Sequence, residues 1–526
     1  MVTQPNRSPG ASMSRMVGNA LRMTVGTLAS RVLGLVREMI TAAVFGATRQ
    51  LDSFYVAYTL ANLARQLLAE GALSAAFVPV FTRVLRDRGM DRAARLARQA
   101  SAVLIGCTLV AVILGILSSG QLVSLMAPGF SPEERAHTAR VTAALFPFLF
   151  FMSTAALAMG VLNSLDRFFV PAVAPALSNL VFILSVWVWY PKVTVWHLVA
   201  AVMMGGASQM ALQWVWSYRC GVPLAPERPD LEDPDLKRML KLFLPYAAGL
   251  SLNQLNPVIS RMLASFLESG AISALNYADR VLQLPLGLFV VATSQAVLPM
   301  LSRIDPEDVA SFRDFLRDAL RFNLLVVLPV SVGLVLFARP TVHLLFYRGA
   351  FGPWALEATS GALRMYGLGL VFMSCNSVIM RALYARGMAR AAMGVTGVTV
   401  VSNLVLGAVL MRFMSYSGLA LGTSLAFLLA SIAGGLAISR RMGLPLGLLD
   451  LRWAVRQGLP LLALTVTLGA YGGFLGYPYQ GGVGARVGWF VLCGVLAVVS
   501  YFGCAALVGL EELRLLRRSG GRREMR

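Results

Sequence analysis

Charged side chains are scarce in this sequence. Of its 526 residues only 13% are Asp, Glu, Lys or Arg, whereas 57% are hydrophobic. An average soluble domain has about 25% charged residues, so the composition excludes a water-soluble globular protein. Apolar runs of roughly 20 residues, long enough to cross a bilayer, recur along the whole chain. The sequence therefore predicts a polytopic membrane protein rather than a soluble domain with one anchor.

Cysteine and histidine are also rare, with five and three residues. The cysteines stand singly in or beside apolar runs, without Cys-x-x-Cys spacing and without a nearby histidine, which excludes a zinc site of that kind. We expect them to be small buried hydrophobic residues, and the histidines to lie at membrane interfaces. No Gly-rich loop precedes a Lys-Ser or Lys-Thr pair, which excludes a P-loop ATPase. No cofactor is expected, and any energy would have to come from an ion gradient, the membrane potential, or consumption of a product on the far side of the membrane.

Fourteen apolar segments are predicted to span the membrane, so the expected fold class is an all-α polytopic membrane protein. The spans cover approximately residues 18–45, 51–84, 98–120, 137–163, 171–190, 194–218, 239–266, 271–301, 314–337, 355–384, 391–413, 416–438, 453–476 and 485–509. Basic clusters follow the even-numbered spans, at residues 83–98, 167, 219–241, 303–321, 386–390, 440–456 and 514–526. The positive-inside rule then places both termini in the cytoplasm. These clusters also account for the net charge of +21 without a nucleic-acid surface.

Two connections carry helix-start signals, Asp233-Pro234 and Asp305-Pro306. In each, the aspartate can cap free amides and the proline fits the first helical position. Asp233-Pro234-Asp235 also matches the Asp-x-Asp metal motif of glycosyltransferases, an alternative that we consider much weaker than the cap.

Three short matches recur along the chain at offsets of 220, 221 and 224 residues. They pair residues 79–83 with 299–303, 151–153 with 372–374, and 178–181 with 402–405. We infer two parallel six-helix repeats, which can rock around a central cavity. The predicted organisation is an N-terminal tail (1–15), an N-lobe with spans one to six (16–225), a C-lobe with spans seven to twelve (226–445), spans thirteen and fourteen (446–512) and a basic tail (513–526).

Polar side chains recur at helical spacing inside four of the spans. The sets are Thr27, Ser30, Arg31, Gly34, Arg37, Glu38 and Thr41; Asp52, Tyr55, Thr59, Asn62, Gln66 and Glu70, with Arg65 beside them; Tyr246, Gly249, Asn253, Asn256 and Ser260; and Ser273, Asn276, Tyr277, Arg280, Gln283, Gly287 and Ser294, with Asp279 at the edge. One arginine at mid-membrane costs about 2.5 to 3.5 kcal/mol. Such arginines need water, carboxylates or an anionic ligand. Because guanidinium groups bind phosphate oxygens bidentately, the stripes predict a wet cavity with a diphosphate site; a purely architectural network of ion pairs is the alternative.

The sequence resembles the MurJ/MviN family of lipid II flippases, in the multidrug/oligosaccharidyl-lipid/polysaccharide exporter superfamily, from about residue 15 to residue 510. The resemblance rests on residues 30–38 (SRVLGLVRE), on Phe45-Gly46 with Asp52-Ser53-Phe54-Tyr55, on residues 68–72 (LAEGA) with Phe77-Val78-Pro79, and on Tyr277-Ala278-Asp279-Arg280. It implies fourteen helices in the bacterial cytoplasmic membrane, two lobes around a cationic cavity, and a groove for the polyprenyl tail near the last two helices. The implied activity is translocation of lipid II for cell-wall synthesis, without making or breaking a bond.

The resemblance and the polar stripes together give the candidate site. The substrate-binding residues are Arg31, Arg37, Arg65 and Arg280, and the supporting residues are Glu38, Asp52, Asn62, Glu70, Pro171, Asn253, Asn256, Ser273, Asp279 and Gln283. Relatives often carry Glu at the position of Gln283. Spans seven, eleven and twelve contain no carboxylate in their apolar stretches, so a sodium site like that proposed for some members lacks its charged ligands.

Three other functions stay open at this point: a related exporter of polysaccharide-lipid intermediates or drugs, a membrane glycosyltransferase or polymerase, and a scaffold that recruits cell-wall enzymes. The glycosyltransferase would need outward-facing carboxylates or a metal site, and the scaffold would not need the polar stripes. The expected partners are lipid II, membrane lipids, and proteins of cell-wall synthesis or division, with no nucleic acid.

Overall fold

The structure is a computed structural model in which every regular element is a helix within the described residues. These residues are 26, 29–66, 72–251, 254–305, 307–443, 447, 450–510 and 512–513. Eight helical segments in them are long and apolar enough to cross a membrane. The prediction of an all-α multi-pass membrane protein is thus confirmed, while the count of fourteen spans stays a prediction. The chain divides into two compact units, Met1–Phe266 and Leu267–Arg526.

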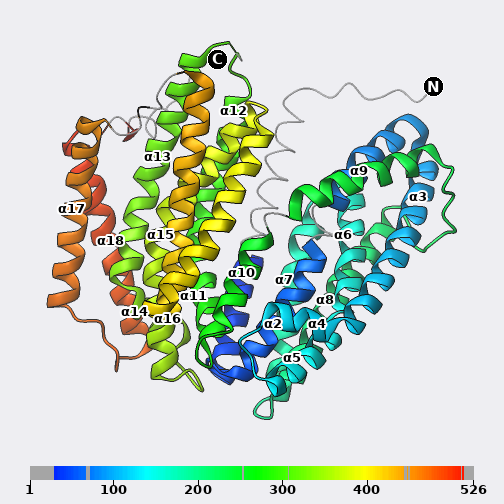
Figure 1. Cartoon of the computed structure of the whole chain (residues 1–526), viewed down its shortest axis with the longest axis horizontal. Helices are drawn as coiled ribbons and strands as arrows, with labels where there is room; N and C mark the ends of the chain where they lie inside the picture. The colour runs from blue at the N-terminus through cyan, green and yellow to red at the C-terminus, as the bar shows by residue number, and fades with distance from the viewer. Residues whose placement is uncertain are drawn as a thin grey trace. The chain divides into compact units, whose positions relative to one another are not determined.

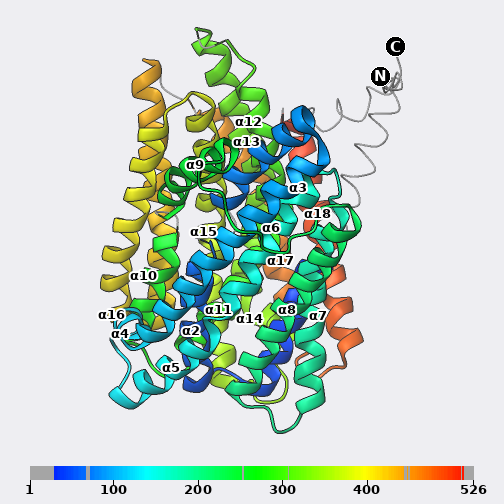
Figure 2. The ribbon, with the colours of Figure 1, turned by 90° about the vertical axis from the view of Figure 1, so that its right-hand side faces the viewer.

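The first unit is built from helices joined mostly by short turns, with a longer linker over residues 220–233 (Figure 1). A helix over residues 29–45 is followed by α2 (Arg49–Arg65), α3 (Ala72–Leu117), α4 (Ser119–Met126), α5 (Pro132–Leu145), α6 (Phe148–Ser164), α7 (Phe169–Trp189), α8 (Val195–Arg219), α9 (Pro234–Ser251) and α10 (Leu255–Ala264). α3 contains two arms because the chain turns at Gly89, whose φ of 82° is a left-handed conformation that glycine adopts without strain. Figure 2 shows α7 and α8 packed side by side.

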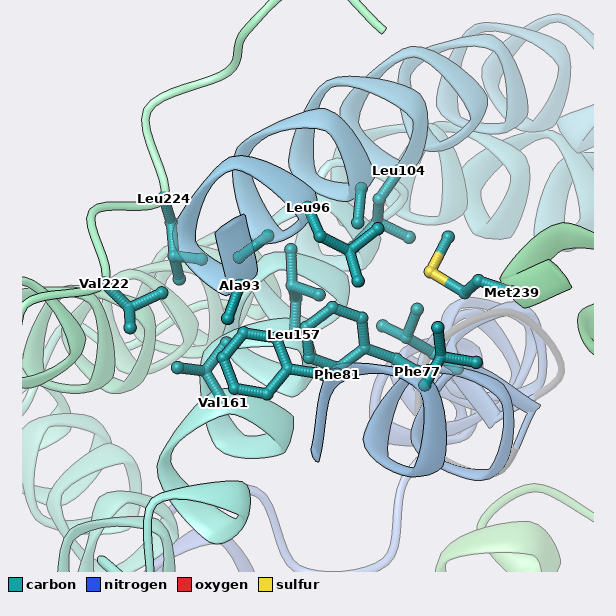
Figure 3. Close-up of a cluster of buried hydrophobic side chains, with 14 of the residues drawn as sticks. Phe77, Phe81, Ala93, Leu96, Leu104, Leu157, Val161, Val222, Leu224 and Met239 are labelled. Carbon is teal, nitrogen blue, oxygen red and sulfur yellow. The ribbon is translucent and has the colours of Figure 1, made fainter. Parts of the chain in front are cut away.

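The two arms of α3 close over a buried apolar cluster (Figure 3). Phe77 and Phe81 from the first arm stack with ring centroids 5.1 Å apart, and Leu96 from the second arm covers them. Leu157 of α6 completes the packing. All four side chains are buried, so this cluster fixes the bend of α3 against α6.

Helix α9 belongs to the first unit by packing. Its residues Leu236 and Met239 lie in the α3 cluster, and α10 contacts α2 and α4. The compact units therefore divide at residues 266 and 267, whereas the sequence repeat predicts lobes that divide at residues 225 and 226. The repeat describes sequence similarity and the units describe packing, so the predicted lobe boundaries stay a prediction.

The second unit has a similar helical construction (Figure 1). It contains α11 (Ala271–Pro285), a π-helical turn η3 (Leu286–Val290), α12 (Val291–Leu301), α13 (Val309–Leu336), α14 (Ala338–Phe346), α15 (Pro353–Ala385), α16 (Ala389–Met442), α17 (Leu451–Phe474) and α18 (Val483–Leu507). The π-turn directly follows Pro285, which cannot donate a backbone hydrogen bond to the helix.

Helix α16 is a hairpin of two spans that turns at Ser415, where φ is 49°. Its arms pack backbone to backbone through small residues. A Cβ placed on Gly422 would lie 2.8 Å from the backbone nitrogen of Gly407. Further along the same interface Thr423 donates a hydrogen bond of 3.0 Å to the side chain of Asn403. Small residues thus allow the close approach of membrane helices that apolar burial alone does not drive.

The three sequence matches lie on corresponding helices of the two units. The first pair falls on α3 and α12, the second on α6 and α15, and the third on α7 and the first arm of α16. α3 packs on α6 as α12 packs on α15. α7 packs on α8 as the first arm of α16 packs on the second. This correspondence agrees with two copies of one helical bundle.

The last two helices of the second unit are held by contacts at both of their ends. At one end Trp489 packs edge-on against Phe337, with centroids 5.0 Å apart, and accepts at its carbonyl a hydrogen bond of 2.9 Å from the Tyr471 hydroxyl. At the other end the Trp453 indole donates a hydrogen bond of 2.7 Å to the carboxylate of Glu512. Polar tips on buried aromatic rings therefore hold this pair.

Two expectations from the sequence need correction. Helix α13 begins at Val309 and is capped by Asp308, not by Asp305, whose side chain closes a turn with the Glu307 amide. The side chain and amide of Ser311 hold the pKa of Asp308 below its usual value. Asp305 lies three residues too early for the cap, because the linker forms a turn before the helix.

The cysteines were expected to be buried, and only Cys493 is. Cys107 is exposed on α3, beside the exposed residues Leu109 and Val110. In a membrane protein an exposed apolar surface faces lipid, so a small hydrophobic residue needs no protein core around it. None of the five cysteines forms a disulfide in the described structure.

Replacing Gly422 with alanine tests the α16 hairpin. The new Cβ would meet backbone atoms of Leu406 and Gly407 within 3.1 Å, and such overpacking costs about 1 to 3 kcal/mol. We expect Gly422→Ala to lower the melting temperature of the purified protein in detergent. Gly397→Ala is the control on the same helix, because its Cβ would meet nothing within 4 Å. Equal melting temperatures for the two variants would contradict the proposed packing.

Candidate functional site

Arg37 lies at the centre of a hydrogen-bonded network in the first unit. It donates one hydrogen bond of 2.9 Å to the carboxylate of Glu38 and one of 3.1 Å to the side-chain oxygen of Asn179 on α7. The second carboxylate oxygen of Glu38 accepts a hydrogen bond of 2.7 Å from the Tyr55 hydroxyl on α2. The guanidinium also lies 5.4 Å from the ring centroid of Phe182. Three helices therefore orient a single arginine.

The helix over residues 29–45 packs along α7 through small and amide side chains. A Cβ on Gly26 would lie 2.8 Å from Ala172, and Asn179 donates a hydrogen bond of 3.3 Å to the Ser30 carbonyl. Further along both helices Arg37 reaches Asn179 and Phe182. Contacts that advance together along both helices mean that the two run parallel, as two odd-numbered spans must.

Arg31 differs from Arg37 in having no hydrogen-bond or ion-pair partner among the described residues. It lies on the same helix, half-buried, and forms no hydrogen bond or ion pair with any described residue. Arg65, at the end of α2, donates a hydrogen bond of 2.9 Å to the side chain of Asn62. The Arg37 charge is balanced by Glu38, whereas the Arg31 charge has no carboxylate beside it within the described part of the chain. This helix can therefore supply a positive charge to an anion.

Asp52 lies apart from that network. It is fully buried at the start of α2, with its carboxylate 3.9 Å from the guanidinium of Arg49. Arg49 also forms an ion pair of 3.1 Å with Glu134 on α5 and lies 4.8 Å from the ring centroid of Phe130. The structure thus places Asp52 in a separate ion-pair cluster that joins α2 to α5.

The remaining candidates of the first unit lie on other helices. Pro171 is buried in the first turn of α7, where a proline disturbs no helical hydrogen bond. Asn256 is half-buried in the first turn of α10. Glu70 and Asn253 lie outside the described residues.

In the second unit the candidates follow one another along α11. Gln283 donates a hydrogen bond to the carboxylate of Asp279 and accepts one of 3.3 Å from Arg280. Gln283 therefore links the acid and the base through a neutral amide. Ser273, two turns earlier, is fully buried.

Two residues of the Arg37 network are not among the candidates predicted from the sequence. Asn179 lies in the internal repeat on α7, and Arg261 lies on α10. The guanidinium carbon of Arg261 lies 5.6 Å from the ring centroid of Tyr55. Arg261 follows the polar stripe of span seven by one residue. This position could have predicted its involvement, because an arginine inside an apolar span requires water, a carboxylate or another polar partner.

Comparison with known proteins places the chain in a family. The family model "Lipid II flippase MurJ" matches residues 41–474. A probable lipid II flippase MurJ of Rhizobium tropici is 32% identical over 515 residues, 94% of this chain and 95% of that protein. A lipid II flippase MurJ of Burkholderia cenocepacia is 34% identical over 427 residues, 79% of this chain and 82% of that protein. This chain belongs to the MurJ family of lipid II flippases.

Solved transporter structures share the fold of this chain. The chain is similar to a lipid II flippase MurJ in an inward closed conformation, with a TM-score of 0.76 and 23% identity, over 92% of this chain and 98% of that one. An inward-facing multidrug transporter of the MATE family gives a TM-score of 0.65 at 15% identity, over 81% of this chain and 98% of that one. Membership of the MurJ family confirms the prediction of a transporter rather than an enzyme.

The Asp-x-Asp motif of this MurJ-family chain has a structural role. Asp233 caps α9, accepting a hydrogen bond of 2.9 Å from the Asp235 amide, and its other oxygen pairs with Arg92. Asp235 forms ion pairs of 3.1 Å with Arg83 and 2.8 Å with Arg88. The cap prediction is confirmed. No group of three or more potential metal ligands exists among the described residues.

Removing Asp235 tests this ion-pair cluster. Its carboxylate is buried while its arginine partners are partly exposed, so water offsets part of the loss. We expect Asp235→Ala to destabilise the protein by about 1 to 3 kcal/mol, seen as a lower melting temperature. Asp87→Ala is the control, since Asp87 pairs with Arg86 at an exposed site and such pairs contribute little. The cluster would have no structural role if both variants melted like the intact chain.

Proposed function

We propose that this chain carries lipid II from the inner to the outer leaflet of the bacterial cytoplasmic membrane by alternating access between its two repeats. Arg31, Arg37, Arg65 and Arg280 bind the diphosphate of the substrate. Membership of the MurJ family supports the substrate, and the charge distribution of the first unit supports the role of the arginines.

The unbalanced charge of Arg31 is the observation that carries this proposal. Arg37 on the same helix is satisfied by Glu38 and Asn179, so its position is fixed before any ligand arrives. Arg31 has no such partner in the described structure, and a guanidinium inside a membrane span costs about 2.5 to 3.5 kcal/mol unless water or an anion solvates it. A diphosphate offsets that cost with charge-assisted hydrogen bonds.

The transport cycle then has four steps. The inward-open state admits the diphosphate-sugar headgroup from the cytoplasmic side, on which both termini also lie. The arginines bind the headgroup, and neutralisation of their charge allows the repeats to rock and open outward. The polyprenyl tail stays in the lipid, in a groove beside α17 and α18, and the headgroup is released at the outer leaflet. The membrane potential or an ion gradient supplies the energy.

Substituting Arg31 tests the function in cells. The assay measures lipid II accessible at the outer leaflet in cells depleted of their own flippase and carrying this chain. We expect the intact chain to restore accessibility and Arg31→Ala to lower it about tenfold or more, since a lost hydrogen bond to a charged group costs about 1.5 to 3 kcal/mol. Arg140→Ala, an exposed arginine on α5, is the control at equal expression and retains activity.

The other outcomes of that assay are equally informative. Full activity of Arg31→Ala would mean that this arginine does not bind substrate. Failure of the intact chain itself, with normal expression and membrane insertion, would contradict lipid II as the substrate.

A further inference from the structure

Arg261 stands next to the Arg37 network without having been assigned a role by the resemblance or by the polar stripes. It is half-buried on α10, and its guanidinium carbon lies 5.6 Å from the ring centroid of Tyr55. At this distance a cation is attracted to the face of an aromatic ring. The ring itself is almost completely buried, so the contact constrains a side chain that has little room to move.

The position of Tyr55 in turn constrains the carboxylate of Glu38. The Tyr55 hydroxyl donates a hydrogen bond of 2.7 Å to one oxygen of Glu38, and the other oxygen accepts from Arg37 at 2.9 Å. Glu38 is 3% exposed, so these two bonds are among the contacts that replace water around its carboxylate. Hydrogen bonds in such a chain polarise and strengthen one another, and a positive charge over the Tyr55 ring makes its hydroxyl a better donor.

We propose that Arg261 is a positioning residue of the anion site. Through Tyr55 it fixes the carboxylate of Glu38, and Glu38 in turn holds the guanidinium of Arg37 in the orientation that receives a diphosphate. The identity of that diphosphate rests on the proposed function, whereas the positioning rests on the contacts alone.

The contact between Arg261 and Tyr55 also connects the two sequence repeats. α10 lies in the seventh predicted span, the first of the second sequence repeat, yet it packs within the first unit. Arg261 therefore links the second repeat to the arginine network of the first. A change in the pairing of Arg37 is transmitted to α10 through two side chains, Glu38 and Tyr55.

The experiment compares binding of two probes to the purified full-length chain in nanodiscs: lipid II and inorganic pyrophosphate. The variants are Arg261→Ala, Arg261→Lys, Tyr55→Phe, and Tyr55→Phe combined with each Arg261 change. Tyr55→Phe keeps the ring under Arg261 and removes the bond to Glu38. Arg219→Ala is the matched control, because Arg219 lies 5.8 Å from the Trp216 ring centroid, outside the network. Melting temperature and gel filtration verify folding.

We expect Arg261→Ala to raise the Kd for both probes roughly 3- to 30-fold, the equivalent of one cation–π contact. Arg261→Lys should restore part of the affinity, and Arg219→Ala should change nothing. In the Tyr55→Phe background neither Arg261 change should weaken binding further, because the path to Glu38 is already cut. If Arg261→Ala does not fold, the lysine variant in both backgrounds gives the same comparison.

Two results would overturn the positioning role. One is an unchanged Kd for Arg261→Ala. The other is a double variant whose fold-increase in Kd equals the product of the increases of the two single variants, because Arg261 would then act independently of Tyr55. The two probes separate this inference from the proposed function. Binding of pyrophosphate but not lipid II, with the expected variant pattern, would reject the substrate and keep the positioning role. Binding of neither probe by the intact chain would reject both.

Discussion

Hydrocarbon cannot solvate charge, and the arrangement of the first unit follows from that constraint. Arg37 is retained in a predicted membrane span because Glu38, Asn179 and the ring of Phe182 replace water around it. Each of these partners requires a particular helix at a particular register. The helix over residues 29–45 therefore packs parallel to α7, and α2 places Tyr55 beneath Glu38. A buried charge thus constrains the packing of three helices.

Elsewhere the helices pack through small residues rather than large apolar ones, because the hydrophobic effect drives little association between helices in lipid. Lipid tails are as apolar as leucine, so two helices gain little by hiding leucines from them. The α16 hairpin accordingly brings its arms together at Gly407 and Gly422. The cluster around Phe77 and Phe81 is different, because it packs the bend of α3 against the linker residues Val222 and Leu224 as well as against membrane helices. The large rings of Phe77 and Phe81 fill the space between the two arms of α3.

Hydropathy was sufficient to predict the fold class, because spans are defined by length and composition. The polar stripes correctly indicated the helices that carry charge, and the motif around Arg31 and Arg37 identified the family. The side chains that pair with each buried charge could not be predicted from the sequence. Asn179 lies 142 residues from Arg37, and its selection depends on helix register, which periodicity does not encode. For the same reason the sequence does not predict the contact of Arg261 with the ring of Tyr55, which lies on another helix.

The hydrogen bond between Trp453 and Glu512 makes the residues after the last membrane helix part of the folded protein. Leu510 is buried in the same cluster as Trp489 and Tyr501. A reporter domain joined directly after Leu507 would displace both Leu510 and Glu512 and leave the Trp453 indole without its acceptor. A fusion joined after Leu513 preserves them. The usable boundary for engineering this chain therefore lies beyond the end of its final hydrophobic helix.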